Sequence, residues 1–243
     1  VIGEATMNNQ NKPNIFMVIL FGIVIFIWAA TIIPQKHGDE QVAEQKVQSK
    51  EEAYVTSVRG KVSELLQKHS TEGFDGDAER VLNRMYDILD EVITDDMLDE
   101  NKVRAIHDYL VYHADYYEGN LDDRPGWTSA IQGVLEQGSG VCNSYALTFY
   151  AMCTAEGIEC RIISGRATNS SGTDGHAWNR VLLSGAWYYI DCTWDDPTGG
   201  GAENYDYYLS PMLWADHEAE EEQNPGEESF ETWKNYYLTG ELW

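Results

Sequence analysis

Apolar residues recur at helical spacing in the first half of the chain. They lie three or four positions apart in residues 53–69, 77–93 and 100–116. This spacing places the apolar side chains on one face of a helix, so we predict three amphipathic helices. Residues 119–128 gather Asp, Pro and Gly and are expected to form a loop.

The pattern changes after residue 140. A further helix is expected to begin after Gly140 and to end at Gly157, since glycine is common just beyond the end of a helix. Short runs with the composition of β-strands follow, at residues 160–163, 178–183 and 187–193. Helices followed by an antiparallel sheet indicate an α+β domain.

Residues 15–33 form an apolar run without charge, flanked by Lys12 and Lys36. At 1.5 Å per residue a helix of this length crosses the apolar core of a bilayer, which is roughly 30 Å thick. A signal peptide has a shorter apolar stretch and a small-x-small cleavage site, so we expect an uncleaved anchor. The two near flanks carry one Lys each and do not decide the orientation. Lys46 and Lys50, farther along the C-terminal side, favour a cytoplasmic location for the domain that follows.

These patterns divide the chain into segments. The predicted boundaries are a polar tail at 1–14, a transmembrane anchor at 15–33, a stalk at 34–52, a helical region at 53–100 and a main domain at 101–243, with a Glu-rich solvated segment at 216–231. Aromatic residues near the end of the chain suggest that it packs back onto the domain.

Composition narrows the classes of partner. The formal net charge is −25, which argues against nucleic acid because phosphate binding needs clustered Lys and Arg. The acidic surface either keeps the domain soluble or attracts amine-bearing substrates. The aromatic content of 12% provides for a substantial core, so the chain is not disordered as a whole.

Cys142 is the candidate nucleophile. It follows Gly138-Ser139-Gly140-Val141 at the expected helix start, where unpaired N–H groups favour a thiolate and can stabilise an oxyanion. A buried structural cysteine is the alternative interpretation. The four cysteines contain no C-x-x-C pair, so we expect no zinc or thioredoxin-type site, and the sequence has no calcium-loop pattern that would indicate another metal. Cys153 and Cys160 are either a disulfide or buried free thiols.

His176 and Asp191 are the candidate base and its orienting carboxylate. If Ser184 and Gly185 form a two-residue hairpin loop, Leu183 pairs with Ala186. His176 then faces position 193, and Asp191, two residues away, shares its face of the sheet. A shift of one residue would separate the two side chains.

The other titratable residues are weaker candidates. His107 and His113 are expected in packing or on the surface, His37 and His69 outside the core, and His217 at the start of the acidic segment. Asp195 and Asp196 are expected in a turn before Pro197.

Three blocks resemble the transglutaminase-like superfamily, in particular its bacterial members. They are Gly140-Val141-Cys142-Asn143-Ser144-Tyr145-Ala146, His176-Ala177-Trp178-Asn179, and residues 187–197, which read WYYIDCTWDDP. The resemblance implies a papain-like α+β core in which Cys142, His176 and Asp191 form a triad. Cys142 would form a thioester with a protein or peptide amide, and an amine or water would resolve it. No cofactor is implied. Ser144 departs from the family, where a glycine is common at this position.

The resemblance leaves the reaction open, since the superfamily includes cross-linking transferases, peptidases, deamidases and inactive members. We expect a membrane-anchored acyl enzyme outside the cytoplasm, because bacterial relatives of this layout often work at the cell envelope. Wall peptides or surface proteins are the substrates expected there. A cysteine peptidase at the cell envelope and a non-catalytic peptide-binding module are the alternatives. The complete triad argues against the binding module.

Overall fold

The computed structural model describes residues 62–196 and 204–241. The chain divides into two compact units, residues 1–48 and 49–243, and every described residue belongs to the second unit. The predicted tail, anchor and stalk lie outside the described residues. Within the described ranges, the structure has no helix with the length and apolar character that crossing a membrane requires.

Three α-helices lie close to the predicted positions. They are α2 (Gly76–Val92), α3 (Asp99–His113) and α4 (Cys142–Ala155). Of the helix predicted at 53–69, only the end lies in the described residues, and residues 62–67 are helical. The predicted end of α3 at residue 116 is wrong, because Asp115–Tyr116 form the short strand β1, which pairs in parallel with β2 (Ser139–Gly140).

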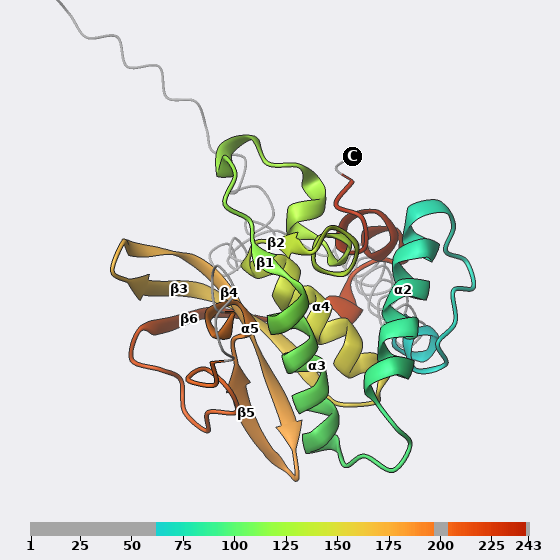
Figure 1. Cartoon of the computed structure of the whole chain (residues 1–243), viewed down its shortest axis with the longest axis horizontal. Coiled ribbons are helices and arrows are strands. Elements are labelled where there is room, and N and C mark those ends of the chain that lie inside the picture. Colours follow the sequence, from blue (N-terminus) through green and yellow to red (C-terminus); the bar gives the residue numbers. More distant parts are fainter. Residues whose placement is uncertain (1–61, 197–203, 242–243) are drawn as a thin grey trace, which may run out of the picture. The chain divides into compact units, whose positions relative to one another are not determined.

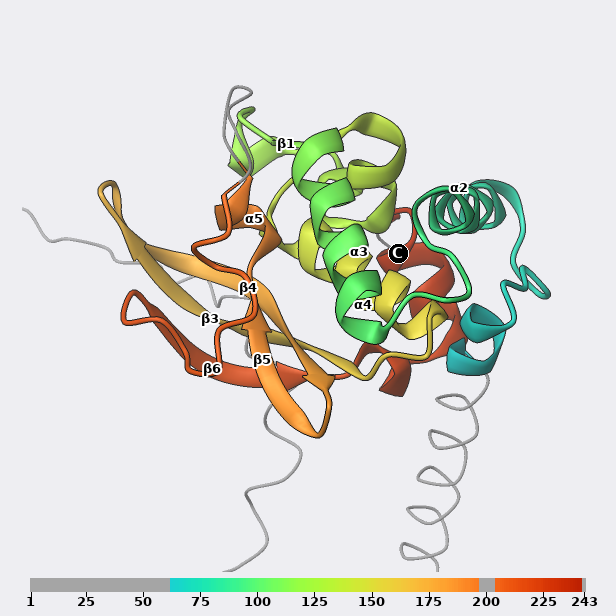
Figure 2. The same ribbon diagram turned by 60° about the horizontal axis from the view of Figure 1, so that its bottom comes forward.

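A four-stranded antiparallel sheet forms the second layer, as Figure 1 shows. Its strands are β3 (Cys160–Asn169), β4 (Gly172–Leu183), β5 (Ala186–Ile190) and β6 (His217–Gln223), in the order β5-β4-β3-β6. Helices α2, α3 and α4 lie together beside this sheet, and α4 packs directly against β3 and β4 (Figure 2). The predicted α+β class is therefore confirmed.

Helix α4 lies in the centre of the core. All residues from Ser144 to Ala155 are buried, so the helix is covered on every side rather than along one apolar face. Its flanking elements are α3 on one side and the sheet on the other. A helix enclosed in this way holds its first residue, Cys142, at a fixed place.

The hairpin between β4 and β5 has the predicted register. Leu183 pairs with Ala186, and Ser184 and Gly185 both have positive φ, at 51° and 83°. This is the geometry of a tight two-residue turn whose twist matches the flanking strands.

The predicted strand at 187–193 is too long, since β5 ends at Ile190 and the short helix α5 (Cys192–Asp195) follows. Asp191 caps this helix, because its Oδ1 accepts from the backbone N–H groups of Thr193 and Trp194 at 3.0 and 3.3 Å. In a continued β-strand these two N–H groups would bond to a neighbouring strand. Here they bond to the side chain of Asp191, so the chain turns into a helix after Ile190.

The Glu-rich segment contains a strand, which corrects the expectation of a purely solvated stretch. Strand β6 pairs with the outer edge of β3, and its Glu side chains remain exposed. Gly165 permits this pairing, because a Cβ at that position would lie 2.0 Å from the carbonyl oxygen of Glu218. The pairing also shifts register between Ser164 and Gly165, as at a β-bulge.

The end of the chain packs onto the domain, as its aromatic residues predicted. Trp233 is fully buried, and its indole N–H donates to the carbonyl of Pro225 at 2.8 Å. The ring of Phe230 contacts that of Phe74. The shorter helical turns are Leu121–Asp123, Gly126–Ser129, Gly133–Gln137, Pro225–Glu227 and Thr232–Tyr237.

Candidate active site

Cys142 is the first residue of α4. Gly138 precedes it with a φ of 62°, and Gly140 allows a close approach, because a Cβ there would lie 2.6 Å from the Cβ of Ser144. The preceding residue, Val141, offers no side-chain cap, so the first N–H groups of the helix have no partner within it. Cys142 is half-buried and carries a free thiol at this helix start.

His176 lies on β4, opposite Gly165 of β3. Its side chain is only 8% exposed and lies between the rings of Trp178 and Trp194, with centroid distances of 5.8 and 5.4 Å. This packing limits rotation of the imidazole. A group that transfers protons needs such a fixed orientation.

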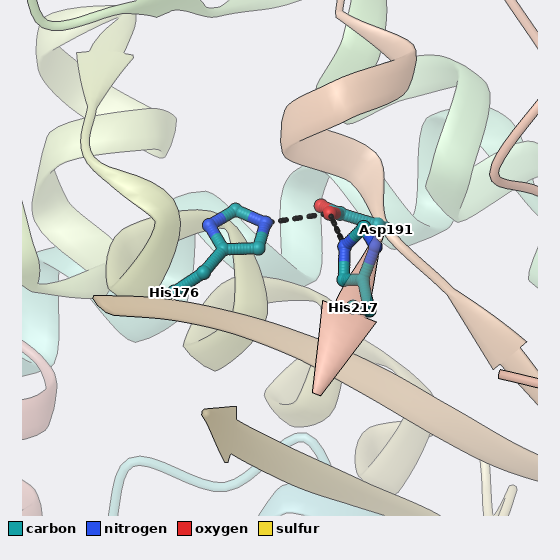
Figure 3. A group of neighbouring side chains, drawn as sticks. All are labelled: His176, Asp191 and His217. Atoms are coloured by element: carbon teal, nitrogen blue, oxygen red, sulfur yellow. Dashed lines mark hydrogen bonds and ion pairs between the residues drawn. The ribbon is translucent and has the colours of Figure 1, made fainter. Parts of the chain in front are cut away.

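Asp191 is buried and binds His176 directly. Its Oδ2 lies 2.6 Å from Nε2 of His176, as Figure 3 shows. The two predicted side chains therefore meet, although Asp191 lies just beyond the end of β5 and not in a strand segment paired with β4. The other oxygen, Oδ1, caps α5, so the carboxylate is held from both ends.

The electrostatics join Cys142 to this pair. Burial by itself lowers the pKa of His176, but the charge and hydrogen bond of Asp191, together with the nearby Cys142, raise it to about 10. Burial likewise raises the pKa of Asp191, but His176 and His217 overcome that effect and hold it at about 2. The structure thus brings the three predicted residues together with His176 as an imidazolium ion and Asp191 as a carboxylate.

His217 also belongs to this group, although its sequence position marked it only as the start of the acidic segment. Its side chain is fully buried, and Nε2 lies 3.2 Å from the same Oδ2 of Asp191. Its Nδ1 lies 2.8 Å from Oδ1 of Asp216. The single sequence signal was a lone histidine at the head of a Glu-rich run, which does not distinguish a buried residue from an exposed one.

A second buried network surrounds His107. Its Nε2 lies 3.1 Å from Asp195, and its Nδ1 lies 3.0 Å from Asp108. Asp196 accepts a hydrogen bond from the hydroxyl of Tyr145 at 2.6 Å. The expectation that Asp195 and Asp196 are simple turn residues is therefore wrong, since both are buried and bonded to helices of the core.

A cavity of about 380 Å³ opens beside His176. Its lining includes Thr193 and Trp194 of α5 and the carboxylates of Asp174 and Asp196. The Thr193 hydroxyl is buried and has no hydrogen-bond partner in the described structure. The cavity thus has both acidic and aromatic residues in its lining next to the imidazole.

The three side chains at Asp191 also have the composition of a metal site. One ligand atom each from His176, Asp191 and His217 lies within 4.8 Å of the others. However, the ligands of a zinc ion stand about 3.3 Å apart when each bond is near 2.0 Å. The 2.6 Å between His176 and Asp191 is a hydrogen-bond distance instead, so the geometry favours proton chemistry.

The remaining cysteines are buried free thiols. Cys153, Cys160 and Cys192 are all buried, and none of them forms a disulfide. Of the two alternatives for Cys153 and Cys160, the structure therefore has the free thiols. Burial raises the pKa of Cys153 and Cys192, so both resist ionisation at neutral pH. Cys142 is the one partly exposed thiol among the four.

The pKa of His176 predicts how stability depends on pH. Because the value of about 10 lies above the ordinary 6.5, its stabilisation is complete below pH 6.5 and is lost as pH rises to about 10. Urea unfolding should therefore give a decreasing free energy of unfolding across that window. The His176→Gln variant should show a flatter profile there, and equal slopes in both proteins would contradict the assignment.

Comparisons with known proteins point to one family. Residues 86–192 match the family model described as the transglutaminase-like superfamily. The chain is 29% identical to the kyphoscoliosis peptidase of Homo sapiens over 118 residues, which are 44% of this chain and 18% of that protein. The Mus musculus protein of the same name is 26% identical over 122 residues, 47% of this chain and 18% of that protein. The chain thus spans less than a fifth of the length of these curated relatives.

Solved structures give a weaker likeness. The crystal structure of a TGase has a TM-score of 0.41 at 17% identity, covering 55% of this chain and 36% of that chain. The periplasmic domain of TgpA from Pseudomonas aeruginosa has a TM-score of 0.37 at 20% identity, covering 46% of this chain and 42% of that chain. The family match contains Cys142, His176 and Asp191 and ends before His217.

Proposed function

Since residues 86–192 carry the core of the transglutaminase-like superfamily, we propose that this protein is a thiol acyl enzyme acting on protein or peptide amides. Cys142 is its nucleophile, His176 its general acid and base, and Asp191 the carboxylate that orients His176. The observation that carries the proposal is the 2.6 Å contact between His176 and Asp191 beside a thiol at a helix start.

The first step is attack of the Cys142 thiolate on the amide carbonyl carbon. A C–S bond forms, and the carbonyl π electrons move to oxygen, where the N–H groups at the start of α4 can stabilise the negative charge. His176 then gives its proton to the amide nitrogen, the C–N bond breaks and an amine leaves. The product of this half-reaction is a thioester on Cys142.

The second step resolves the thioester. His176, now neutral, accepts a proton from the attacking amine or water as the new bond to the carbonyl carbon forms. The C–S bond breaks and Cys142 leaves as a thiolate beside the restored imidazolium ion. Asp191 keeps Nε2 of His176 protonated throughout, so the other ring nitrogen faces the reacting atoms.

A cysteine peptidase uses the same residues and differs only in using water as the acceptor. The curated relatives are named kyphoscoliosis peptidase, which favours this alternative. A non-catalytic peptide-binding module has no need for a buried imidazolium–carboxylate pair, because burying charges is costly unless they are used or fully paired.

Attachment to a membrane is part of the proposal. It rests on the uncharged apolar run at residues 15–33. The catalytic domain then acts at the extracytoplasmic face of the membrane, on substrates such as wall peptides or surface proteins. Labelling of an added surface cysteine by a reagent that cannot cross membranes would establish the side on which the domain lies.

The assay that tests the reaction uses the full chain, a glutamine-containing peptide library and a labelled primary amine. Incorporation of the amine would indicate acyl transfer, and cleaved peptides would indicate a peptidase. Cys142→Ser is the control for background reaction. If neither product forms above that control, the proposal of a thiol acyl enzyme fails.

A further inference from the structure

We propose that His217 is a positioning residue that holds Asp191 in the orientation His176 requires. This inference rests on the proposed function, because it concerns the same site. His217 lies on β6, outside the segment that matches the family model, and its imidazole reaches the same carboxylate as that of His176 (Figure 3).

Four donors surround the Asp191 carboxylate. Two are the imidazole nitrogens of His176 and His217, which lie 2.6 and 3.2 Å from the same oxygen, Oδ2. The other two are the backbone N–H groups that bind Oδ1. Without His217, the backbone contacts fix Oδ1 alone, and Oδ2 is held only by the group that it has to orient. His217 therefore supplies the independent constraint on Oδ2.

His217 is itself held in place. Its Nδ1 faces Oδ1 of Asp216, while the hydroxyl of Tyr207 donates to Oδ2 of Asp216 at 2.7 Å. Each ring nitrogen of His217 thus lies within hydrogen-bond distance of a carboxylate oxygen, so the ring is held at both ends. The titratable groups that face His217 are Asp191, Asp216, His176 and Tyr207.

Aromatic rings enclose the same imidazole. The centroids of Trp178, Trp194 and Trp214 lie 4.9, 4.5 and 5.0 Å from that of His217, and Tyr207 lies at 5.5 Å. Rings at this range leave the imidazole little room to turn. They also exclude water, which strengthens the hydrogen bond to Asp191.

The fold shows that His217 has a specific place. It is the one buried residue of β6, since the remaining residues of the strand are exposed. Gly165, opposite His176 in β3, is the position where any larger residue would meet the β6 backbone. A purely structural role at the head of β6 needs only an apolar side chain, because replacing buried ion pairs by apolar groups is often neutral or stabilising.

That difference defines the experiment. His217→Leu fills the aromatic enclosure but removes the donor, whereas His217→Gln keeps an N–H donor. We expect His217→Leu to slow alkylation of Cys142 by iodoacetamide, and to lower kcat in the peptide assay with KM little changed, by roughly ten- to a hundredfold. His217→Gln should recover both rates to within about threefold of the wild type.

Matched controls separate positioning from stability. His107→Gln alters the other buried histidine that lies between two carboxylates, and it should leave both rates within about twofold while lowering the melting temperature. A wild-type rate in folded His217→Leu would overturn the proposal, as would an equal loss in the Leu and Gln variants. If the Leu variant does not fold, Asp216→Asn decides, and an unchanged rate there would contradict a held imidazole.

The outcome stays distinct from that of the proposed function. Nitrogen-15 NMR of labelled histidines reports the His176–Asp191 hydrogen bond without any substrate. If the wild type has no peptide activity, the proposed function fails, yet a displaced His176 signal in His217→Leu still supports positioning. An unchanged His176 signal in that variant would overturn the inference by itself.

Discussion

Replacement of Cys142 by serine is expected to abolish both thioester formation and peptide turnover, with a loss of at least about 10³-fold. A serine hydroxyl is a much weaker nucleophile than a thiol, so the reacting group is lost while the shape of the site remains. Intact-mass measurement after incubation with an activated ester would detect the acyl adduct in the wild type and none in the variant.

Alkylation by iodoacetamide identifies the reacting thiol. Iodoacetamide should modify Cys142 first near neutral pH, because the other three cysteines are buried. His176→Ala should slow this reaction, and the melting temperature of Cys142→Ser should stay near that of the wild type. Equal alkylation of Cys142 in the wild type and the His176→Ala variant would show that the two residues do not act together.

Replacement of Asp191 by asparagine should reduce turnover at pH 7 by roughly 10³- to 10⁴-fold. The amide carries no charge, so burial then lowers the pKa of His176 without the opposing effect of a carboxylate. The imidazole becomes neutral and can adopt the wrong tautomer. The variant also replaces a buried carboxylate that is hydrogen-bonded to two imidazoles, so we expect stability to fall by about 3 kcal/mol.

NMR titration of His176 and urea unfolding measure these two effects in one protein. Asp195→Asn is the matched control, because Asp195 is a buried carboxylate that binds His107 in the same way. It should cost comparable stability while the pKa of His176 stays near 10. A high pKa of His176 in Asp191→Asn would mean that another group stabilises the imidazolium ion.

The local features of the site were predictable because local patterns encode them. Ser184 and Gly185 specify a tight turn, and that turn sets the register of β4 and β5 as far as the Asn179–Ile190 pair, directly before Asp191. The glycines before Cys142 likewise mark a helix start. The end of β5 was misjudged, because the capping bonds of Asp191 compete with continuation of the strand.

The position of His217 depends on contacts between distant segments, so sequence spacing could not reveal it. Strand β6 has no alternation of apolar and polar residues, and its pairing with β3 depends on the space beside Gly165. The burial of His107 with Asp195 was missed for the same reason, since these partners are 88 positions apart. Helical or strand periodicity indicates which face of an element is apolar, but it does not indicate which polar side chains will be buried.

Strand β6 also sets the time at which the site is completed during synthesis. His217 follows Asp191 by 26 positions and is made after every other side chain that contacts that carboxylate. A ribosome-bound chain that has not yet exposed β6 would leave the outer edge of β3 unpaired and Oδ2 of Asp191 without its second imidazole. Full organisation of the thiol site therefore waits until β6 has been made and has paired with β3.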